Sequence, residues 1–240
     1  MYRMSGQVRF SETDEQGRLK LGSLMNYMQD CVMLHCESIG VGLKYLNANH
    51  RVWLLSSWQV VIEDCPKLYD EITVETRPYE FTSCYGHRNF LISDKSGKTL
   101  VKANSIWVYV NTETGRPARP PEEEKAAYSL DERIEMDYAP RKLSLPENMT
   151  DVAPIPVRAD DIDLNHHVNN ARYIEIALGL MPDISNIKEL RVEYKRQAHL
   201  GDTIYPKIAT VDDSCFVDLA DADGKTYTSV QVIGNPSTTG

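Results

Sequence analysis

The densest polar stretch of the chain runs from Asp160 to Asn170 and could carry acid–base chemistry. Within it Asp163, Asn165 and His167 stand two residues apart, so an extended backbone would place their side chains on one side. A carboxylate, an amide and an imidazole that converge in this way can activate water and orient an ester-like substrate. The stretch therefore predicts a hydrolytic site.

The position of this stretch matters because it comes directly before a predicted helix from about Asn170 to Leu180. A helix N-terminus presents unpaired N–H groups and a partial positive charge, which would stabilise an oxyanion forming on an acyl carbonyl group. We expect the backbone at Asn169, Asn170 and Ala171 to face that oxygen. The alternative is structural, because Asp and Asn favour turns and Asn169 or Asn170 could simply cap the helix.

The elements that must position these residues occur in two similar sets. Apolar residues at helical spacing and then Gly40 predict a helix from about Leu21 to Ile39, and β-branched or aromatic runs predict strands near 57–62, 72–76, 89–92 and 105–110. Seven of the twelve prolines lie between Pro117 and Pro156 and indicate a surface connector. The helix from Asn170 and strands near 189–196, 203–211, 215–220 and 226–233 then repeat the order.

Residue identity supports this duplication. Val8, Arg9 and Asp14 align with Val157, Arg158 and Asp163 at one offset. The turn Asp94–Thr99 resembles the turn Asp221–Thr226, each with a Gly-Lys-Thr end, and a glycine suits the positive φ of a hairpin turn. A phosphate-binding loop would need another glycine five residues earlier, where the chain has Ile92 and Leu219. The pattern predicts an α+β fold of two antiparallel sheets, each with a long helix, joined as a pseudo-dimer.

Composition narrows the function classes. A formal charge of −9 disfavours a surface that binds nucleic acid, and no apolar run approaches the roughly 20 residues of a membrane span. The N-terminal residues lack the features of a signal peptide, and the five cysteines form no Cys-x-x-Cys pair, so we expect a cytoplasmic, reducing location. Cys31, His35 and Cys36 are too few to form a structural zinc site, and we expect no metal and no cofactor.

Thirteen residues carry a family resemblance. The run Asp161–Tyr173 resembles the Asp-x-Asn-x-His-x-Asn-Asn-x-x-Tyr signature of the acyl-acyl carrier protein (acyl-ACP) thioesterases, which are tandem hot-dog enzymes. The resemblance extends to the N-terminal helix, the proline-rich connector and the strand containing Val192–Arg196. It implies that residues 1–128 form an N-terminal hot-dog domain shaping the acyl tunnel, 129–150 a connector and 151–234 the catalytic hot-dog domain. The small, polar residues 235–240 predict a disordered tail.

The resemblance also implies roles for individual residues. Asp163, Asn165 and His167 take the catalytic positions: Asp163 or His167 as the base, with direct attack by Asp163 as another route, and Asn165 as the residue that orients substrate or water. The family usually has Glu where this chain has Gln197, and an amide can hold a water but cannot accept its proton. We therefore expect Gln197 either to position water or to be a polar strand end facing solvent.

The expected reaction is hydrolysis of a fatty acyl-ACP thioester, releasing free fatty acid and ending chain elongation. The partner would be acyl carrier protein bearing the acyl group on phosphopantetheine. An acyl-CoA thioesterase of the same fold is one alternative, and a non-catalytic acyl-carrier-binding protein, motivated by Gln197, is another. The absence of a Gly-x-Ser-x-Gly motif argues against a serine hydrolase. Exposed strand edges would also allow a homodimer.

Overall fold

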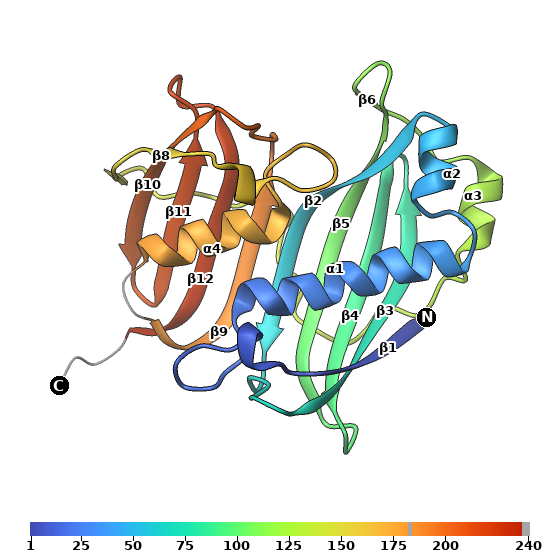
Figure 1. Cartoon of the computed structure of the whole chain (residues 1–240), viewed down its shortest axis with the longest axis horizontal. Coiled ribbons are helices and arrows are strands. Elements are labelled where there is room, and N and C mark those ends of the chain that lie inside the picture. The colour runs from blue at the N-terminus through green and yellow to red at the C-terminus, as the bar shows by residue number, and fades with distance from the viewer. Residues whose placement is uncertain (182–183, 237–240) are drawn as a thin grey trace. The chain divides into compact units, whose positions relative to one another are not determined.

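The computed structural model describes residues 1–181 and 184–236, and the chain forms two compact units. Unit 1 comprises Met1–Ser56 and Ile62–Ala139, and unit 2 comprises Ser57–Val61 and Pro140–Gly240. Each unit is an antiparallel sheet with a helix lying across one face (Figure 1). No helix in the described part of the chain is long and apolar enough to cross a membrane.

Unit 1 is built on helix α1, Leu21–Ser38, which contacts strands β1 and β3. Its strands are β1 Tyr2–Gln7, β2 Arg51–Ile62, β3 Glu71–Thr82, β4 Tyr85–Asp94 and β5 Thr99–Asn111, in the spatial order β1-β3-β4-β5-β2, with the short β6 Arg116–Pro117 beside β5. The apolar positions that predicted the helix, Leu24, Met25 and Met28 among them, are buried. Gly40, with φ +77°, follows its end and donates to Glu37 O at 3.1 Å.

Unit 2 repeats this plan around helix α4, Asn170–Leu180, which contacts β11 and β12. Its strands are β7 Thr150–Asp151, β8 Ile155–Pro156, β9 Ile184–Tyr194, β10 Thr203–Val211, β11 Ser214–Ala220 and β12 Thr226–Pro236. The order is β9-β12-β11-β10-β7, β8 also pairs with β10, and Ser57–Val61 of β2 pair with β9. The predicted bounds of α4 are those of the structure, and the eight predicted strands are all present, most of them longer than expected.

The two predicted hairpin turns are confirmed and are alike in detail. Asp94 N–H donates to Lys98 O at 3.0 Å and its Oδ1 accepts from the N–H of Ser96 at 2.8 Å. In unit 2, Asp221 makes the same pair of contacts, with Lys225 O at 3.0 Å and with Asp223 N–H at 3.0 Å. The glycines take φ values of +85° and +77°, which explains the residue type at these positions.

Several elements differ from expectation. The structure adds β1, the 3-10 turns η1 Phe10–Glu12 and η2 Ala159–Asp161, and helices α2 Leu43–Ala48 and α3 Glu122–Ala127. The stretch after Pro117, where the prolines indicated only a connector, thus contains the short helix α3. One of its residues, Glu124, is only 1% exposed. Trp53 Nε1 donates to its Oε1 at 3.0 Å, and the Tyr109 hydroxyl donates to its Oε2. Two neutral donors compensate for burying this carboxyl.

Parts of the predicted connector and of the predicted tail make defined contacts with the sheets. Within the connector, Ile134 N–H and Tyr138 Oη donate to the buried Asn89 Oδ1, at 3.2 and 3.0 Å, so this part packs on the sheet of unit 1. Asn235 and Pro236, expected in a disordered tail, belong to β12 and pair with β9. The rest of that predicted tail, 237–240, lies outside the described residues.

Candidate active site

The loop before α4 is a tight turn and not the extended segment that was expected. Ile162 and Val168 form an antiparallel bridge, Asp163 N–H donates to His167 O at 2.9 Å, and His166 N–H donates to Asp163 O at 3.0 Å. His166 adopts φ +63° at the turn, an uncommon conformation for a residue that is not glycine. The turn brings Asp163 and His167 together at its base and carries Asn165 to its tip.

The four predicted catalytic side chains are therefore placed unequally. Asp163 and His167 are half-buried, whereas Asn165 and Gln197 are exposed. Asp163 Oδ1 accepts the N–H of Asn165 at 2.8 Å, which fixes the orientation of the carboxylate. Nδ1 of His167 is buried and has no hydrogen-bond partner among the described residues. An unpaired buried imidazole nitrogen is costly, and such groups cluster at functional sites.

The start of α4 confirms the capping interpretation for Asn169. Its Oδ1 accepts the N–H of Ala171 at 2.8 Å, and its own N–H donates to Asp161 O at 2.8 Å. Two of the three backbone N–H groups proposed for the oxyanion, those of Asn169 and Ala171, are thus engaged within the chain. The dipole of α4 still directs a partial positive charge towards this end of the helix.

Two tyrosines hold α4 against the segment that follows β9. Tyr173, buried in α4, accepts the N–H of Ala198 on its hydroxyl at 2.7 Å, and Ala198 O accepts the N–H of Val168 at 2.9 Å. Tyr194 Oη donates to Asn170 O at 3.0 Å. These bonds fix Ala198, and with it the backbone next to Gln197, beside the loop. Tyr173 closes the sequence signature, yet its structural role was not predicted.

The electrostatic environment of His167 suits a base. Burial lowers the pKa of His167, the neighbouring His199 and His166 lower it further, and Asp163 opposes them. A lowered pKa keeps the imidazole neutral, with a free lone pair, at physiological pH. The ring of His199 lies edge-on to that of His167, with centroids 4.7 Å apart and planes at 67°. His199 lies outside the sequence signature, and this contact was not predicted.

Unit 1 contains the same loop without the same chemistry. Asp14 N–H donates to Arg18 O at 2.8 Å, and Thr13 and Leu19 form the bridge. Gly17 takes the positive φ of +72° that His166 takes in unit 2. Arg18 occupies the position of His167, and its Nε binds Asp14 Oδ2 at 2.9 Å. Burial alone would raise the pKa of Asp14, but the contacts with Arg18 outweigh it and lower the pKa.

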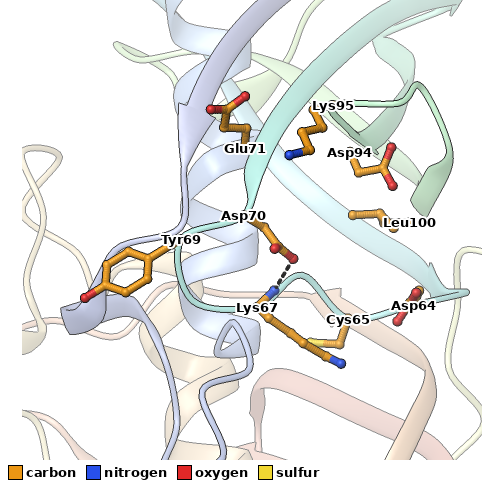
Figure 2. A pocket seen from close by; sticks show the side chains of 9 residues that line it. All are labelled: Asp64, Cys65, Lys67, Tyr69, Asp70, Glu71, Asp94, Lys95 and Leu100. Atoms are coloured by element: carbon orange, nitrogen blue, oxygen red, sulfur yellow. Dashed lines mark hydrogen bonds between the residues drawn. The ribbon is translucent and has the colours of Figure 1, made fainter.

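A polar pocket of about 270 Å³ lies beside this loop of unit 1 (Figure 2). Lys67 and Asp70, which line it, are held by a bond from Lys67 N–H to Asp70 Oδ2 at 2.8 Å. Residues 67 and 70 correspond to His199 and Asp202 of unit 2, which make the same bond at 2.9 Å. The lining carries several carboxylates, two lysines and a partly buried thiol, Cys65, but no imidazole. The unit 1 loop therefore keeps the backbone of the candidate site and lacks its base.

Cys31 and His35, considered above as metal ligands, have hydrogen-bond partners in unit 1. His35 is 5% exposed and pairs through Nδ1 with Arg88 Nη1 at 2.9 Å, while Cys31 Sγ donates to Val74 O at 3.5 Å. Within the described residues no group of three His, Cys, Asp or Glu side chains could hold a metal ion. The contacts of Cys31 and His35 fit the structural interpretation of these residues.

Comparison with known proteins accounts for both units. The sequence profile of the acyl-ACP thioesterase N-terminal domain matches residues 1–128, and that of the C-terminal domain matches residues 144–233. Among curated relatives, the chloroplastic acyl-acyl carrier protein hydrolase FATB3 of Cuphea viscosissima is 28% identical over 229 residues, which cover 89% of this chain and 55% of that protein. The chain thus spans about half the length of the curated relatives it matches.

Solved structures extend the likeness to the whole fold. An acyl-ACP thioesterase from Bacteroides thetaiotaomicron is 26% identical, with a TM-score of 0.88 and 96% of each chain covered. The 12:0-ACP thioesterase from Umbellularia californica, at 22% identity, shares the fold with a TM-score of 0.87, covering 98% of this chain and 97% of that one. The α+β tandem hot-dog fold predicted from the sequence is confirmed. By the two matching domains, the chain belongs to the acyl-ACP thioesterase family.

Proposed function

We propose that this protein hydrolyses the thioester of a fatty acyl-ACP and so releases free fatty acid. The observation that carries the proposal is the turn before α4, in which Asp163 N–H donates to the backbone oxygen of the half-buried His167 at 2.9 Å, in a chain of this family. The proposed site residues are Asp163, Asn165, His167 and Gln197, with the helix dipole at Asn169 to Ala171 acting in place of the engaged N–H groups. Acyl carrier protein is the proposed partner, as in the names of the relatives.

The reaction begins when water attacks the acyl carbonyl carbon and His167 takes the proton. The oxygen that becomes negative faces the N-terminus of α4, whose dipole stabilises it. The carbon–sulfur bond then breaks. The departing thiol has a pKa near 8.5 in its free form, so it leaves as thiolate with little acid assistance. Asp163, held through Oδ1, keeps its other oxygen for the attacking water.

Gln197 gives the non-catalytic alternative its support. Its exposed side chain has no hydrogen-bond partner within the described ranges, and an amide cannot act as a base. We assign it to holding a water beside the loop that carries Asp163 and His167. An acyl-CoA thioesterase would use the same residues with a different carrier, so only the substrate distinguishes it from the proposed enzyme.

The test is an assay of the purified chain with acyl-ACP and acyl-CoA of several chain lengths. Thiol release is followed with a colour reagent, and protein without substrate corrects for its own thiols, since all five cysteines are free. We expect faster release from acyl-ACP, and loss of at least 100-fold in Asp163→Ala and His167→Ala. Release from neither substrate would leave only the binding protein, and full activity in Asp163→Ala would refute the site.

Compartment and assembly are part of this proposal. The free cysteines suit a reducing cytoplasm. The expected homodimer stays a prediction that sedimentation of the purified chain would test.

A further inference from the structure

His199 contacts the candidate base although it lies outside the sequence signature. Its ring packs edge-on against His167 with centroids 4.7 Å apart. His199 is exposed and His167 half-buried, so the outer imidazole covers the inner one. Nδ1 of the inner ring has no partner among the residues described, which leaves packing to fix its orientation.

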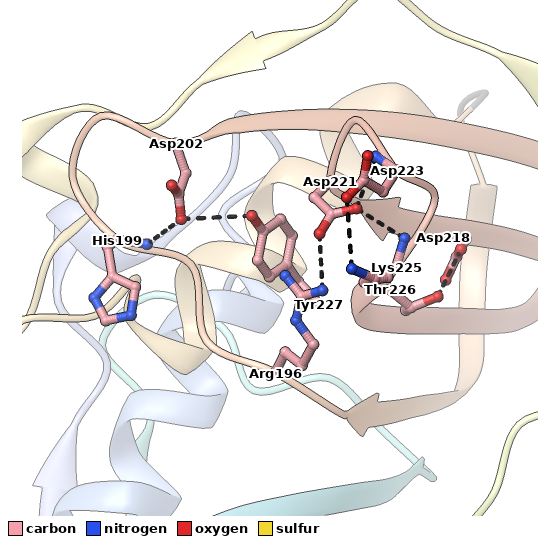
Figure 3. Close-up of polar contacts among 9 residues, drawn as sticks. All are labelled: Arg196, His199, Asp202, Asp218, Asp221, Asp223, Lys225, Thr226 and Tyr227. Atoms are coloured by element: carbon pink, nitrogen blue, oxygen red, sulfur yellow. Dashed lines mark hydrogen bonds and ion pairs between the residues drawn. The ribbon is translucent and has the colours of Figure 1, made fainter.

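The backbone holds His199 in this place (Figure 3). Its N–H donates to Asp202 Oδ2 at 2.9 Å, and Asp202 N–H donates to His199 O at 3.1 Å. Tyr227 Oη reaches the same carboxylate oxygen at 3.4 Å, and Gly201, with φ +95°, allows the tight turn between them. On the other side, Ala198 is fixed by the Tyr173 hydroxyl at 2.7 Å. The turn that places the His199 ring against His167 is therefore fixed by hydrogen bonds.

Unit 1 shows that the fold brings these two positions together whatever the residues are. Arg18 and Lys67, which occupy the places of His167 and His199, form an isolated antiparallel bridge. Lys67 N–H donates to Asp70 Oδ2 at 2.8 Å (Figure 2), and Asp70 N–H donates to Lys67 O at 2.9 Å, which are the same two hydrogen bonds as those between His199 and Asp202. Two cationic residues stand there, whereas unit 2 has two imidazoles. The fold thus places these two positions side by side in both units, and it is unit 2 that has imidazoles there.

We propose that His199 is a positioning residue of the thioesterase site, whose imidazole packs against the His167 ring and fixes its orientation. The proposal rests on the proposed function. The contact also disfavours the protonated form of His167. A charge on His199 would repel a charge on His167, and the His199 ring removes water from one side of the His167 ring. Both effects favour the neutral His167 that hydrolysis needs.

The charged groups around His167 shift its pKa in both directions. Burial, then His199 and His166 lower the pKa of His167, and Asp163 raises it. Removing the His199 ring both exposes His167 and removes a potential positive neighbour, so each consequence moves its pKa upward. Replacing the ring by phenylalanine keeps the packing and removes only the charge.

The test compares His199→Ala and His199→Phe with wild type, and uses His50→Ala as a control because the exposed His50 lies in unit 1. The titration of His167 is followed by NMR of its imidazole Cε1–H, and kcat/KM is measured with acyl-ACP from pH 5 to 9. We expect the His167 midpoint to rise in both variants, with a loss of about three- to tenfold in kcat/KM at pH 6. At pH 8 His199→Phe should keep the wild-type rate, and His199→Ala should lose several-fold because its His167 ring is no longer oriented.

The outcomes separate this proposal from the proposed function. An unchanged His167 titration in both variants, or a wild-type rate of His199→Ala at pH 6 and pH 8, would overturn the role of His199 while leaving the enzyme intact. If wild type releases no thiol, the proposed function fails, and the NMR titration alone then decides whether His199 acts on His167.

Discussion

The cap of α4 allows stability and catalysis to be separated at one residue. Asn169 Oδ1 accepts the Ala171 N–H at 2.8 Å, so Asn169→Ala removes one capping bond. Loss of such a cap costs about 1 kcal/mol, which lowers Tm by about 2–4 °C in a chain of this size. Lys20 holds the same position before α1 without a side-chain cap, so Lys20→Ala should change stability by less than about 0.5 kcal/mol.

Asn169→Asp keeps the cap and tests catalysis. Aspartate caps as well as asparagine, so the free energy of unfolding should stay within about 0.5 kcal/mol of wild type. The added negative charge opposes an oxyanion at the same helix end, however. At an effective dielectric constant of about 20 and a separation of roughly 10 Å the repulsion is about 1.7 kcal/mol, or roughly fifteenfold in kcat/KM. Thermal unfolding and thiol release measure the two effects, and a fully active, stable Asn169→Asp would refute an oxyanion at the start of α4.

Three further predictions concern buried or altered polar groups. Burial and then Arg88 lower the pKa of His35 to about 4, below its unfolded value near 6.5. As pH falls, the unfolded state therefore binds the proton before the folded state does. The free energy of unfolding should fall by up to about 3 kcal/mol as pH drops from 6.5 to 4. Denaturant unfolding should show this slope in wild type and His50→Gln, and a slope kept by His35→Gln would contradict it. Glu124→Ala should cost about 2–4 kcal/mol in the same assay, since it leaves two buried donors unpaired, and an unchanged midpoint would disprove that pairing. Gln197→Glu should raise kcat/KM several-fold if a carboxylate there assists water, and a slower variant would argue that the amide is the adapted residue.

The sequence was sufficient for elements whose signal is local. Helix α4 was predicted with its observed bounds because Asn169 and a periodic apolar stretch mark its start and length. The hairpins at Gly97 and Gly224 followed from turn chemistry alone. By contrast, β1 contains Ser5 and Gly6, which have low strand propensity, and it exists because it pairs with β3.

The candidate site was predicted in its residues but not in its geometry. Spacing by two suggested an extended segment, whereas His166 adopts positive φ and folds Asp163 against His167, leaving Asn165 exposed. No local pattern indicates that backbone conformation. His199 was missed because its contact with His167 spans 32 residues and depends on the turn closed by Asp202.

The central claim is that only the loop of unit 2 is catalytic, and the duplicated backbone supplies a matched control. Asp163→Asn and Asp14→Asn make the same chemical change in two loops with the same backbone hydrogen bond. Asp163 N–H donates to His167 O at 2.9 Å, and Asp14 N–H donates to Arg18 O at 2.8 Å. The measurement is kcat/KM for thiol release from acyl-ACP by both variants. We predict a loss of at least 100-fold for Asp163→Asn and less than twofold for Asp14→Asn. Equal losses, or a loss confined to Asp14→Asn, would contradict the account.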